Sequence, residues 1–189
     1  MIDATFVEAP RQRNTREENL KIKAGEGKEL WNDKPYKKRQ KDIDARWTKK
    51  NNDTFYGYKN HVKADTKSKF VVNYAVTDAS VHDSQVIEDL LEESDSGQPL
   101  YADSAYFGEK QEEIIAKYKM INKVHEKGFR DHPLDEKQKA NNRTKSTIRA
   151  RVEHVFGFME QSMKGIFVRS IGLDRSFATA GLYNLGYNI

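Results

Sequence analysis

Three acidic residues, Asp3, Asp103 and Glu153, lie where carboxylates from distant parts of the chain could share one site. Asp3 belongs to Met1–Val7, which has the composition of a strand, and Asp103 closes the apolar run Pro99–Asp103. Glu153 lies on a predicted helix. Three hard oxygen ligands facing one cleft repel one another unless cations neutralise them, and magnesium prefers oxygen ligands. The triad therefore predicts a site for two divalent metal ions that could act on phosphodiesters.

The ordinary interpretation of these acids is that each is a helix cap or a surface charge. The chain contains 29 Asp and Glu residues, so a set of three is easy to find. Asp78 and Asp83 are further acids with possible metal-binding roles, although their positions favour turns and caps. The sequence around the triad must therefore decide between the two interpretations.

Long blocks around the triad, taken in order, resemble the DDE transposases of bacterial insertion sequences. The blocks are Asp3–Thr5 with Glu8–Arg13, Asp44–Lys50, Tyr56–His61, Val76–Gln85, Tyr101–Tyr106, Arg149–Gly157 and Gly181–Asn188. Several long blocks in one order are much more specific than a single short motif. The resemblance implies a ribonuclease-H-like catalytic domain that hydrolyses DNA phosphodiesters and transfers strands at the ends of the element.

The resemblance also implies roles for the three acids. Asp3 and Asp103 would each bind magnesium, with one carboxylate bridging both ions, and Glu153 would complete the second site. Manganese would serve as a substitute. One ion would lower the pKa of an attacking water or 3′-hydroxyl, and the other would stabilise the leaving oxygen of an in-line displacement.

The last catalytic helix of related transposases carries a Tyr, Arg, Glu, Lys signature. Arg149 and Glu153 fit its central part, whereas Ser146 stands at the tyrosine position and Glu160 at the lysine position. Lys164 is expected one turn later on the same helix and is the candidate substitute for the lysine. The predicted apolar stripe of this helix consists of Ile148, Val152, Val155, Phe156, Met159 and Met163. Glu153 would border this buried stripe and lean toward the aspartates.

The formal charge of +4 conceals blocks of opposite charge along the chain. Residues 11–50 hold 14 Lys and Arg against 7 Asp and Glu, and residues 137–169 hold 8 against 2, whereas residues 51–100 hold 4 against 9. Two basic segments around a carboxylate cluster are typical of proteins that bind a polyanion, although a solvated charged surface has the same composition. The candidate DNA-binding residues are Trp47, Lys49, Lys50, Arg149, Arg151, His154 and Lys164. For Trp47 and His154, packing against the protein is the alternative role.

Periodicity and turn composition predict one α/β domain over residues 1–189, with a mixed sheet flanked by helices. Residues 11–55 form a charged insertion after the first strand, with at most short helices. The predicted elements after it are a hairpin of Phe55–Ala64 and Phe70–Thr77, a helix around Val86–Leu91 with an Asp or Ser cap, a strand that ends at Asp103, a helix over Gly108–Tyr118, a strand over Met120–His125 and C-terminal helices.

The chain has no cysteine, no signal-peptide pattern and no apolar run of membrane-spanning length, which predicts a soluble protein of the cytoplasm. The resemblance to transposases implies a bacterial protein that associates with the nucleoid. Its expected partners are double-stranded DNA, further copies of itself and an upstream chain that reads the element's ends, because such a region is expected before Asp3. Activity without that region is left open. Two alternatives are a metal-dependent nuclease unrelated to transposition and a truncated DNA-binding remnant. Thr5 replaces the second acid that an aspartyl-phosphate enzyme would need.

Overall fold

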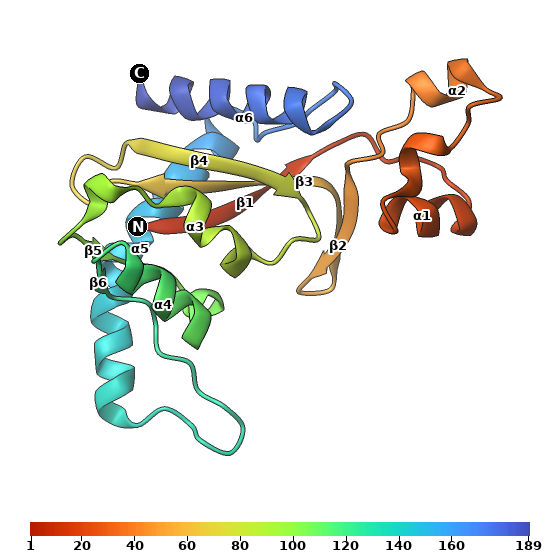
Figure 1. The fold of residues 1–189 in the computed structure, drawn as a ribbon. Helices are drawn as coiled ribbons and strands as arrows, with labels where there is room; N and C mark the ends of the chain where they lie inside the picture. The colour runs from red at the N-terminus through yellow and green to blue at the C-terminus, as the bar shows by residue number, and fades with distance from the viewer.

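The computed structural model describes residues 1–189, and its centre is a four-stranded antiparallel sheet (Figure 1). Strand β3 (Asp53–Ala64) lies in the middle, with β1 (Ile2–Glu8) along one edge. Strand β4 (Val71–Asp78) pairs with the second half of β3, and β2 (Arg46–Lys50) pairs with its first half. The sheet thus joins the start of the chain to segments more than fifty residues later.

Two short strands extend the architecture beyond β1. Strand β5 (Pro99–Leu100) pairs in parallel with β6 (Ile121–Asn122). The Ile2 N–H donates a hydrogen bond to the Tyr101 carbonyl over 2.9 Å, which places the end of β5 beside the start of β1. The predicted mixed α/β character is therefore confirmed.

Helices cover both faces of the sheet. They are α1 (Arg16–Lys23), α2 (Pro35–Arg39), α3 (Ile87–Leu90), α4 (Glu109–Lys117), α5 (Glu136–Gln161) and α6 (Leu173–Asn188), with 3-10 turns η1 (Glu26–Glu29), η2 (Asp83–Val86), η3 (Glu93–Asp95) and η4 (Ser104–Tyr106). Figure 1 shows α6 along one face of the sheet and α3 and α4 on the opposite side, whereas α1 and α2 project from its end. None of the helices has the length and apolar character needed to cross a bilayer.

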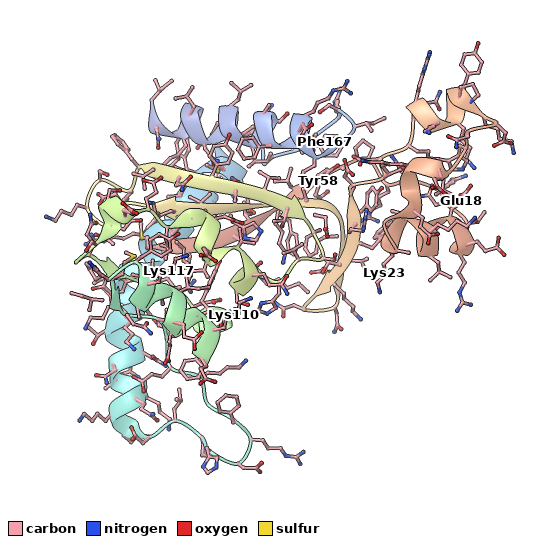
Figure 2. The ribbon with its side chains drawn as sticks, in the orientation of Figure 1. Glu18, Lys23, Tyr58, Lys110, Lys117 and Phe167 are labelled. Atoms are coloured by element: carbon pink, nitrogen blue, oxygen red, sulfur yellow. The ribbon has the colours of Figure 1, made fainter.

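The projecting part is held together by the Glu18 carboxylate, which α1 carries (Figure 2). This carboxylate accepts hydrogen bonds from the Trp31 indole and the Lys37 ammonium, each over 2.6 Å. Thr15 and Glu18 also form a capping box at the start of α1. The projection is therefore an ordered structure built from polar contacts around a single tryptophan.

The sheet separates two apolar cores because side chains alternate between its faces. Val7, Tyr58 and Val62 pack with Val152 and Val155 of α5 on one face. The core on the other face contains Ile2, Ile87, Leu90, Leu100, Ala102, Tyr106 and Ile115. Strand β1 contributes to both cores, so a residue next to its buried positions is held firmly in place.

Two contacts fasten α6 to the sheet. The side-chain amides of Asn60 and Asn184 exchange hydrogen bonds over 2.9 and 3.2 Å and are both buried. Gly181 lies so close to Tyr74 that a Cβ there would come within 2.3 Å of the tyrosine hydroxyl. A larger residue would push the helix off the sheet, which explains a glycine in the middle of α6.

The predicted hairpin is confirmed as β3 and β4, but three boundaries differ from the prediction. Residues 46–50 belong to the sheet as β2, so the inserted segment between β1 and the rest of the sheet ends earlier than residue 55. The predicted helix around Val86 is an α-helix only over Ile87–Leu90, after a 3-10 turn that His82 caps. Strand β6 is formally short, although Lys123 and His125 continue its hydrogen bonds to Leu100 and Ala102.

The prediction that Met163 and Lys164 belong to the last catalytic helix is wrong. Helix α5 ends at Gln161, and the backbone of Lys164 has a φ of +63°. Gly165 follows with a φ of +71° and donates its N–H to the Met159 carbonyl. This left-handed pair terminates the helix because it satisfies a free carbonyl of the last turn.

Candidate active site

Asp3 lies on β1 with its side chain directed toward α5. One carboxylate oxygen accepts the Ala4 N–H over 2.9 Å, and the other accepts a hydrogen bond from the Arg149 guanidinium over 3.1 Å. The Asp3 side chain is only 19% exposed. A carboxylate this buried is costly unless it is paired, so Arg149 is a structural partner of Asp3.

Arg149 also binds the third acid of the predicted triad. A second nitrogen of its guanidinium donates to Glu153 over 2.5 Å, one turn further along α5. Arg149, a predicted DNA-binding residue, therefore bridges Asp3 and Glu153 in the structure. The Glu153 side chain remains 55% exposed. The remaining guanidinium nitrogen, Nε, is buried without a hydrogen-bond partner.

Asp103 comes to the same region through the short strand β5. Its carboxylate caps η4 by accepting the Ala105 N–H over 2.8 Å, and β5 lies beside β1 through the bond from Ile2 to Tyr101. This local cap orients the Asp103 side chain at the point where the strand ends.

The pKa of Asp3 reports how close these acids are. Burial raises the pKa from 3.8 to about 6, the Ala4 N–H and Arg149 oppose the rise, and the negative charges of Asp103 and Asp83 add to it. The negative charges of Asp103 and Asp83 thus reach Asp3, and the Arg149 guanidinium is the cation bound to Asp3. Such a site has an excess of negative charge that a further cation would relieve.

The donor chemistry fits a hard divalent cation, since the site offers carboxylate oxygens and an excess of negative charge. No three His, Asp or Glu side chains lie close enough together to hold a metal ion in the present arrangement. Arg149 instead occupies the space between Asp3 and Glu153. Binding of a metal by all three predicted ligands therefore requires the guanidinium to move.

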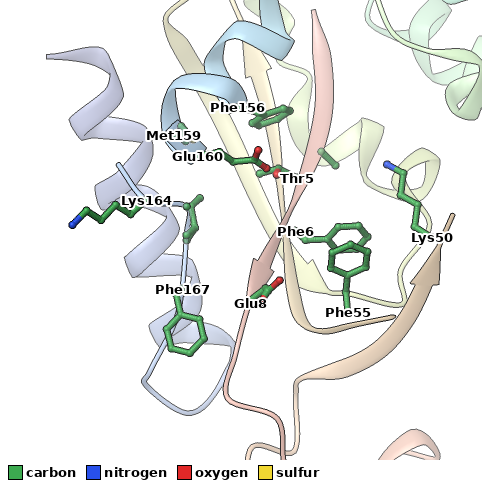
Figure 3. A pocket seen from close by; sticks show the side chains of 13 residues that line it. Thr5, Phe6, Glu8, Lys50, Phe55, Phe156, Met159, Glu160, Lys164 and Phe167 are labelled. Carbon is green, nitrogen blue, oxygen red and sulfur yellow. The ribbon is translucent and has the colours of Figure 1, made fainter. Parts of the chain in front are cut away.

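A groove of about 490 Å³ runs along β1 next to the triad (Figure 3). Its lining comes from β1, β2, β3, α5 and the segment that follows α5. The lining residues are Ala4, Thr5, Phe6, Glu8, Lys50, Phe55, Phe156, Met159, Glu160, Lys164, Gly165, Ile166 and Phe167. The rings of Phe6 and Phe55 stack with centroids 4.0 Å apart. Figure 3 shows Glu160 pointing toward Thr5, whereas the Lys164 side chain extends away from the groove. Two predicted DNA-binding residues, Lys50 and Lys164, thus line the same groove from opposite sides although 114 positions separate them.

The other predicted DNA-binding residues have different surroundings. Arg151 donates to the Thr66 carbonyl in the turn between β3 and β4. Trp47 packs on Tyr56 with ring centroids 4.9 Å apart and remains 41% exposed. Lys49 on β2 and His154 on α5 are exposed to solvent. The structure therefore gives Arg151 and Trp47 packing contacts, and it leaves the side chain of His154 at the surface.

Three polar residues near the acids were not assigned to the site from the sequence. Asp83 accepts a hydrogen bond from the Lys59 ammonium over 2.8 Å. It is not the helix cap that its position suggested, because His82 caps η2. The Tyr106 hydroxyl and the Nδ1 atom of His61 are buried without hydrogen-bond partners. Burial lowers the pKa of His61 to about 4. The only sequence signal for Tyr106 was its place three residues after Asp103 in a block shared with known transposases.

Comparison with known proteins identifies the family of this chain. The family described as "Transposase DDE domain" matches residues 1–189. The chain belongs to this family. The transposase domain is 30% identical over 149 residues to "Transposase for insertion sequence element IS1106" of Neisseria meningitidis serogroup B, an alignment that covers 79% of this chain and 51% of that protein. The domain thus spans about half the length of this curated relative. No solved structure matches it significantly.

Proposed function

We propose that this transposase domain cleaves DNA phosphodiesters at the ends of an insertion sequence and joins the released strands to target DNA. The observation that supports the proposal is that Arg149 links Asp3 of β1 to Glu153 of α5 in a chain of the DDE transposase family. Asp3 and Glu153 share a single guanidinium, and Asp3 and Asp103 repel each other.

The strand arrangement supports a ribonuclease-H-like core as part of this proposal. Strands β1, β3 and β4 are antiparallel neighbours, and β5 with β6 forms a parallel pair beside the start of β1. Asp3 then lies on β1, Asp103 follows β5 at the start of η4, and Glu153 comes from the helix that packs on β1. The match of the family over residues 1–189 supports one catalytic domain, as the sequence predicted.

Asp3, Asp103 and Glu153 would hold two magnesium ions, with manganese as a substitute. Such ions supply an activated water or 3′-hydroxyl and stabilise the leaving oxygen of the phosphodiester. The residues of the chain contribute in other ways: Arg149 holds Asp3 and Glu153 in place, and the Ala4 N–H fixes the second oxygen of Asp3. Released from the two acids, the Arg149 guanidinium would be available to bind a DNA phosphate.

The groove along β1 offers a path for DNA away from the acids. Lys50 and Lys164 lie at its border, and neither has an ion-pair partner in the protein. Lys49, Arg151, His154 and Trp47 would extend the contact to phosphates and sugars on the surrounding surface. Cations spread in this way bind the phosphate backbone without reading base identity. We propose double-stranded DNA and a second copy of the domain as partners, with end recognition supplied by an upstream region or partner chain.

The test is a strand-transfer assay with a duplex that carries the element's terminal repeat, a target plasmid and magnesium or manganese. The complete element-encoded transposase and the 189-residue domain are compared. We expect the single variants Asp3→Asn, Asp103→Asn and Glu153→Gln each to abolish cleavage and joining. This expectation applies to the complete transposase and, if the 189-residue domain is active, to the domain as well. Exposed Asp33→Asn is the matched control and should keep both activities.

The same assay separates the proposal from its two alternatives. Cleavage without joining by the complete protein would indicate a nuclease that is unrelated to transposition. DNA binding with neither reaction would indicate a binding remnant. Full activity of the three acid variants would overturn the assignment of the catalytic residues.

A further inference from the structure

His125 lies next to Asp103 in the small parallel ladder of β5 and β6. The ladder continues past the formal end of both strands, because the His125 N–H donates a hydrogen bond to the Ala102 carbonyl over 3.0 Å. In a parallel pair this bond places Ala102 opposite Val124, and the next pair along is Asp103 with His125. Neighbouring strands are about 4.8 Å apart, so Asp103 and His125 are direct lateral neighbours.

The side chains of this pair project from the face of the sheet that α5 covers. Ala102 and Val124, which come just before them, are both buried in the core on the opposite face. The backbone of Asp103 is extended, so the alternation of side chains between the two faces continues through Asp103. A direct contact with α5 confirms the orientation of the imidazole, since the Ser146 Oγ atom lies 3.3 Å from His125 Nε2.

Helix α5 also fixes the order of His125, Asp103 and Asp3 along the sheet. Ser146 contacts His125, and Arg149, three residues later, binds Asp3. Three residues of a helix rise about 4.5 Å, so the two contacts are close together. Strand β5 lies between them, because it pairs with β6 on one side and its end bonds to β1 on the other (Figure 1). Asp103 is therefore flanked by the imidazole and by the carboxylate of Asp3.

Ser146 determines which nitrogen of His125 carries the proton. A serine hydroxyl has one proton, and Ser146 donates it to the Asn142 carbonyl over 2.8 Å. The contact with His125 must then be an Nε2–H that donates to the serine oxygen. In the neutral imidazole this leaves a lone pair on Nδ1, which has no hydrogen-bond partner in the protein. Ser146, which departs from the predicted signature, thus acquires a role in orienting the ring.

We propose that His125 is a metal ligand of this domain and that its Nδ1 atom binds a divalent transition ion together with the carboxylate of Asp103. One oxygen of Asp103 accepts the Ala105 N–H, and the other has no hydrogen-bond partner in the protein. Magnesium prefers oxygen ligands, whereas an imidazole nitrogen favours transition ions, among which manganese is the expected substitute for magnesium. Ser146 is the outer partner that orients the ligand. The inference rests on the proposed metal site and adds a nitrogen ligand to its acids.

The test detects nitrogen bound to manganese in the metal-free 189-residue domain as manganese is added up to saturation. Electron spin echo envelope modulation should show coupling to a directly bound nitrogen. The coupling should change to that of the heavier isotope when the domain is made with histidine labelled with nitrogen-15. His125→Ala should lose the coupling and bind manganese at least about tenfold more weakly, because even the outer partners of a ligand typically contribute that much. Magnesium affinity, measured by competition, should change less.

Two further variants separate ligation from folding. His125→Gln lacks the imidazole but keeps a side-chain N–H that can donate to Ser146, so it should retain the thermal midpoint and still lose the nitrogen coupling. His132→Ala removes an exposed histidine from the segment before α5 and is the matched control. It should keep the coupling, the manganese affinity and the midpoint.

The outcomes distinguish this inference from the proposed function. Manganese that binds without coupling to a histidine nitrogen at any occupancy would overturn the role of His125 and leave a site made of acids intact. Coupling that persists in both His125 variants would assign the nitrogen to another histidine, which also overturns the proposal. Absence of manganese binding by the unchanged domain would refute the metal site itself, and the role of His125 with it.

Discussion

Replacing Asp3 with asparagine should stabilise the metal-free domain at neutral pH, although it removes an ion pair. The folded domain raises the pKa of Asp3 from 3.8 to about 6 because the carboxylate is buried and lies near Asp103 and Asp83. A raised pKa means that folding favours the protonated acid. The contribution of Asp3 to stability is therefore fully present below pH 3.8 and is lost as the pH rises through about 6.

The expected magnitude follows from the size of this shift. A rise of roughly two pKa units corresponds to about 3 kcal/mol of unfolding free energy when the acid is fully ionised. When the pH rises from about 4.5 to about 7.5, the unfolding free energy of the wild-type domain should fall by about 2 kcal/mol through Asp3. The rest of the roughly 3 kcal/mol is lost below pH ~4.5. The Asp3 side chain is 19% exposed, so solvent screening reduces the effect only modestly. Asparagine resembles the protonated acid and does not titrate, so the Asp3→Asn variant should lose no unfolding free energy at this position over the same pH range.

The assay is urea unfolding of wild type and Asp3→Asn at the two pH values in the presence of a chelator. Taking the difference between the two proteins cancels the titration of all groups they share, such as His61. Asp65→Asn is a control of opposite sign, because hydrogen bonds from Ser68 lower the pKa of Asp65. If the difference in unfolding free energy between wild type and Asp3→Asn is the same at both pH values, the reasoning is refuted. Excess manganese at pH 7.5 should stabilise wild type more than Asp3→Asn.

Three further predictions follow from contacts elsewhere in the domain. Asn184→Ala should lower the free energy of unfolding by about 1–3 kcal/mol, because it leaves the buried Asn60 amide unpaired. In urea unfolding, the double variant Asn60→Ala with Asn184→Ala should lose less unfolding free energy than the sum of the losses of the two single variants. Arg149→Gln should lower stability by about 1–2 kcal/mol at pH 7.5 and by less at pH 4.5, where Asp3 is protonated; an equal loss at both pH values would contradict the pairing. Lys50→Gln and Lys164→Gln should each reduce the salt dependence of DNA binding by about one unit of slope, measured by fluorescence anisotropy over a salt series, with no change in thermal midpoint. An unchanged slope would place the DNA outside the groove.

Local sequence patterns predicted much of the fold correctly. The hairpin of β3 and β4 was recognisable because alternating residues on both strands surround a short polar turn, and its boundaries differ from the prediction by only a few residues. The helix over Glu109–Lys117 was also placed correctly, and the strand predicted to end at Asp103 exists as β5 but ends at Leu100. These elements depend on neighbouring residues, so a linear sequence contains the information that determines them.

The errors occurred where the pattern of side chains did not match the backbone interactions that set the bounds of an element. Met163 fits the apolar stripe of α5, but the left-handed backbone of Lys164 and Gly165 ends the helix before that stripe is complete. Residues 46–50 are highly charged and were included in the insertion, yet they form β2 because β3 is long enough to pair with a further strand. In both cases a backbone interaction outweighed the pattern of side chains.

The sequence by itself identified the family and predicted three candidate acids, because the blocks that surround Asp3, Asp103 and Glu153 are specific and occur in one order. Only the tertiary structure decided which residues pair with these acids and how their negative charge is compensated. Arg149 and Asp3 are 146 positions apart and meet only because α5 packs on β1. The raised pKa of Asp3 and the unpaired hydroxyl of Tyr106 likewise depend on burial and on charges from other elements. Burial and electrostatic neighbours are properties of the folded chain, so a sequence pattern can name the ligands but cannot show what holds them in place.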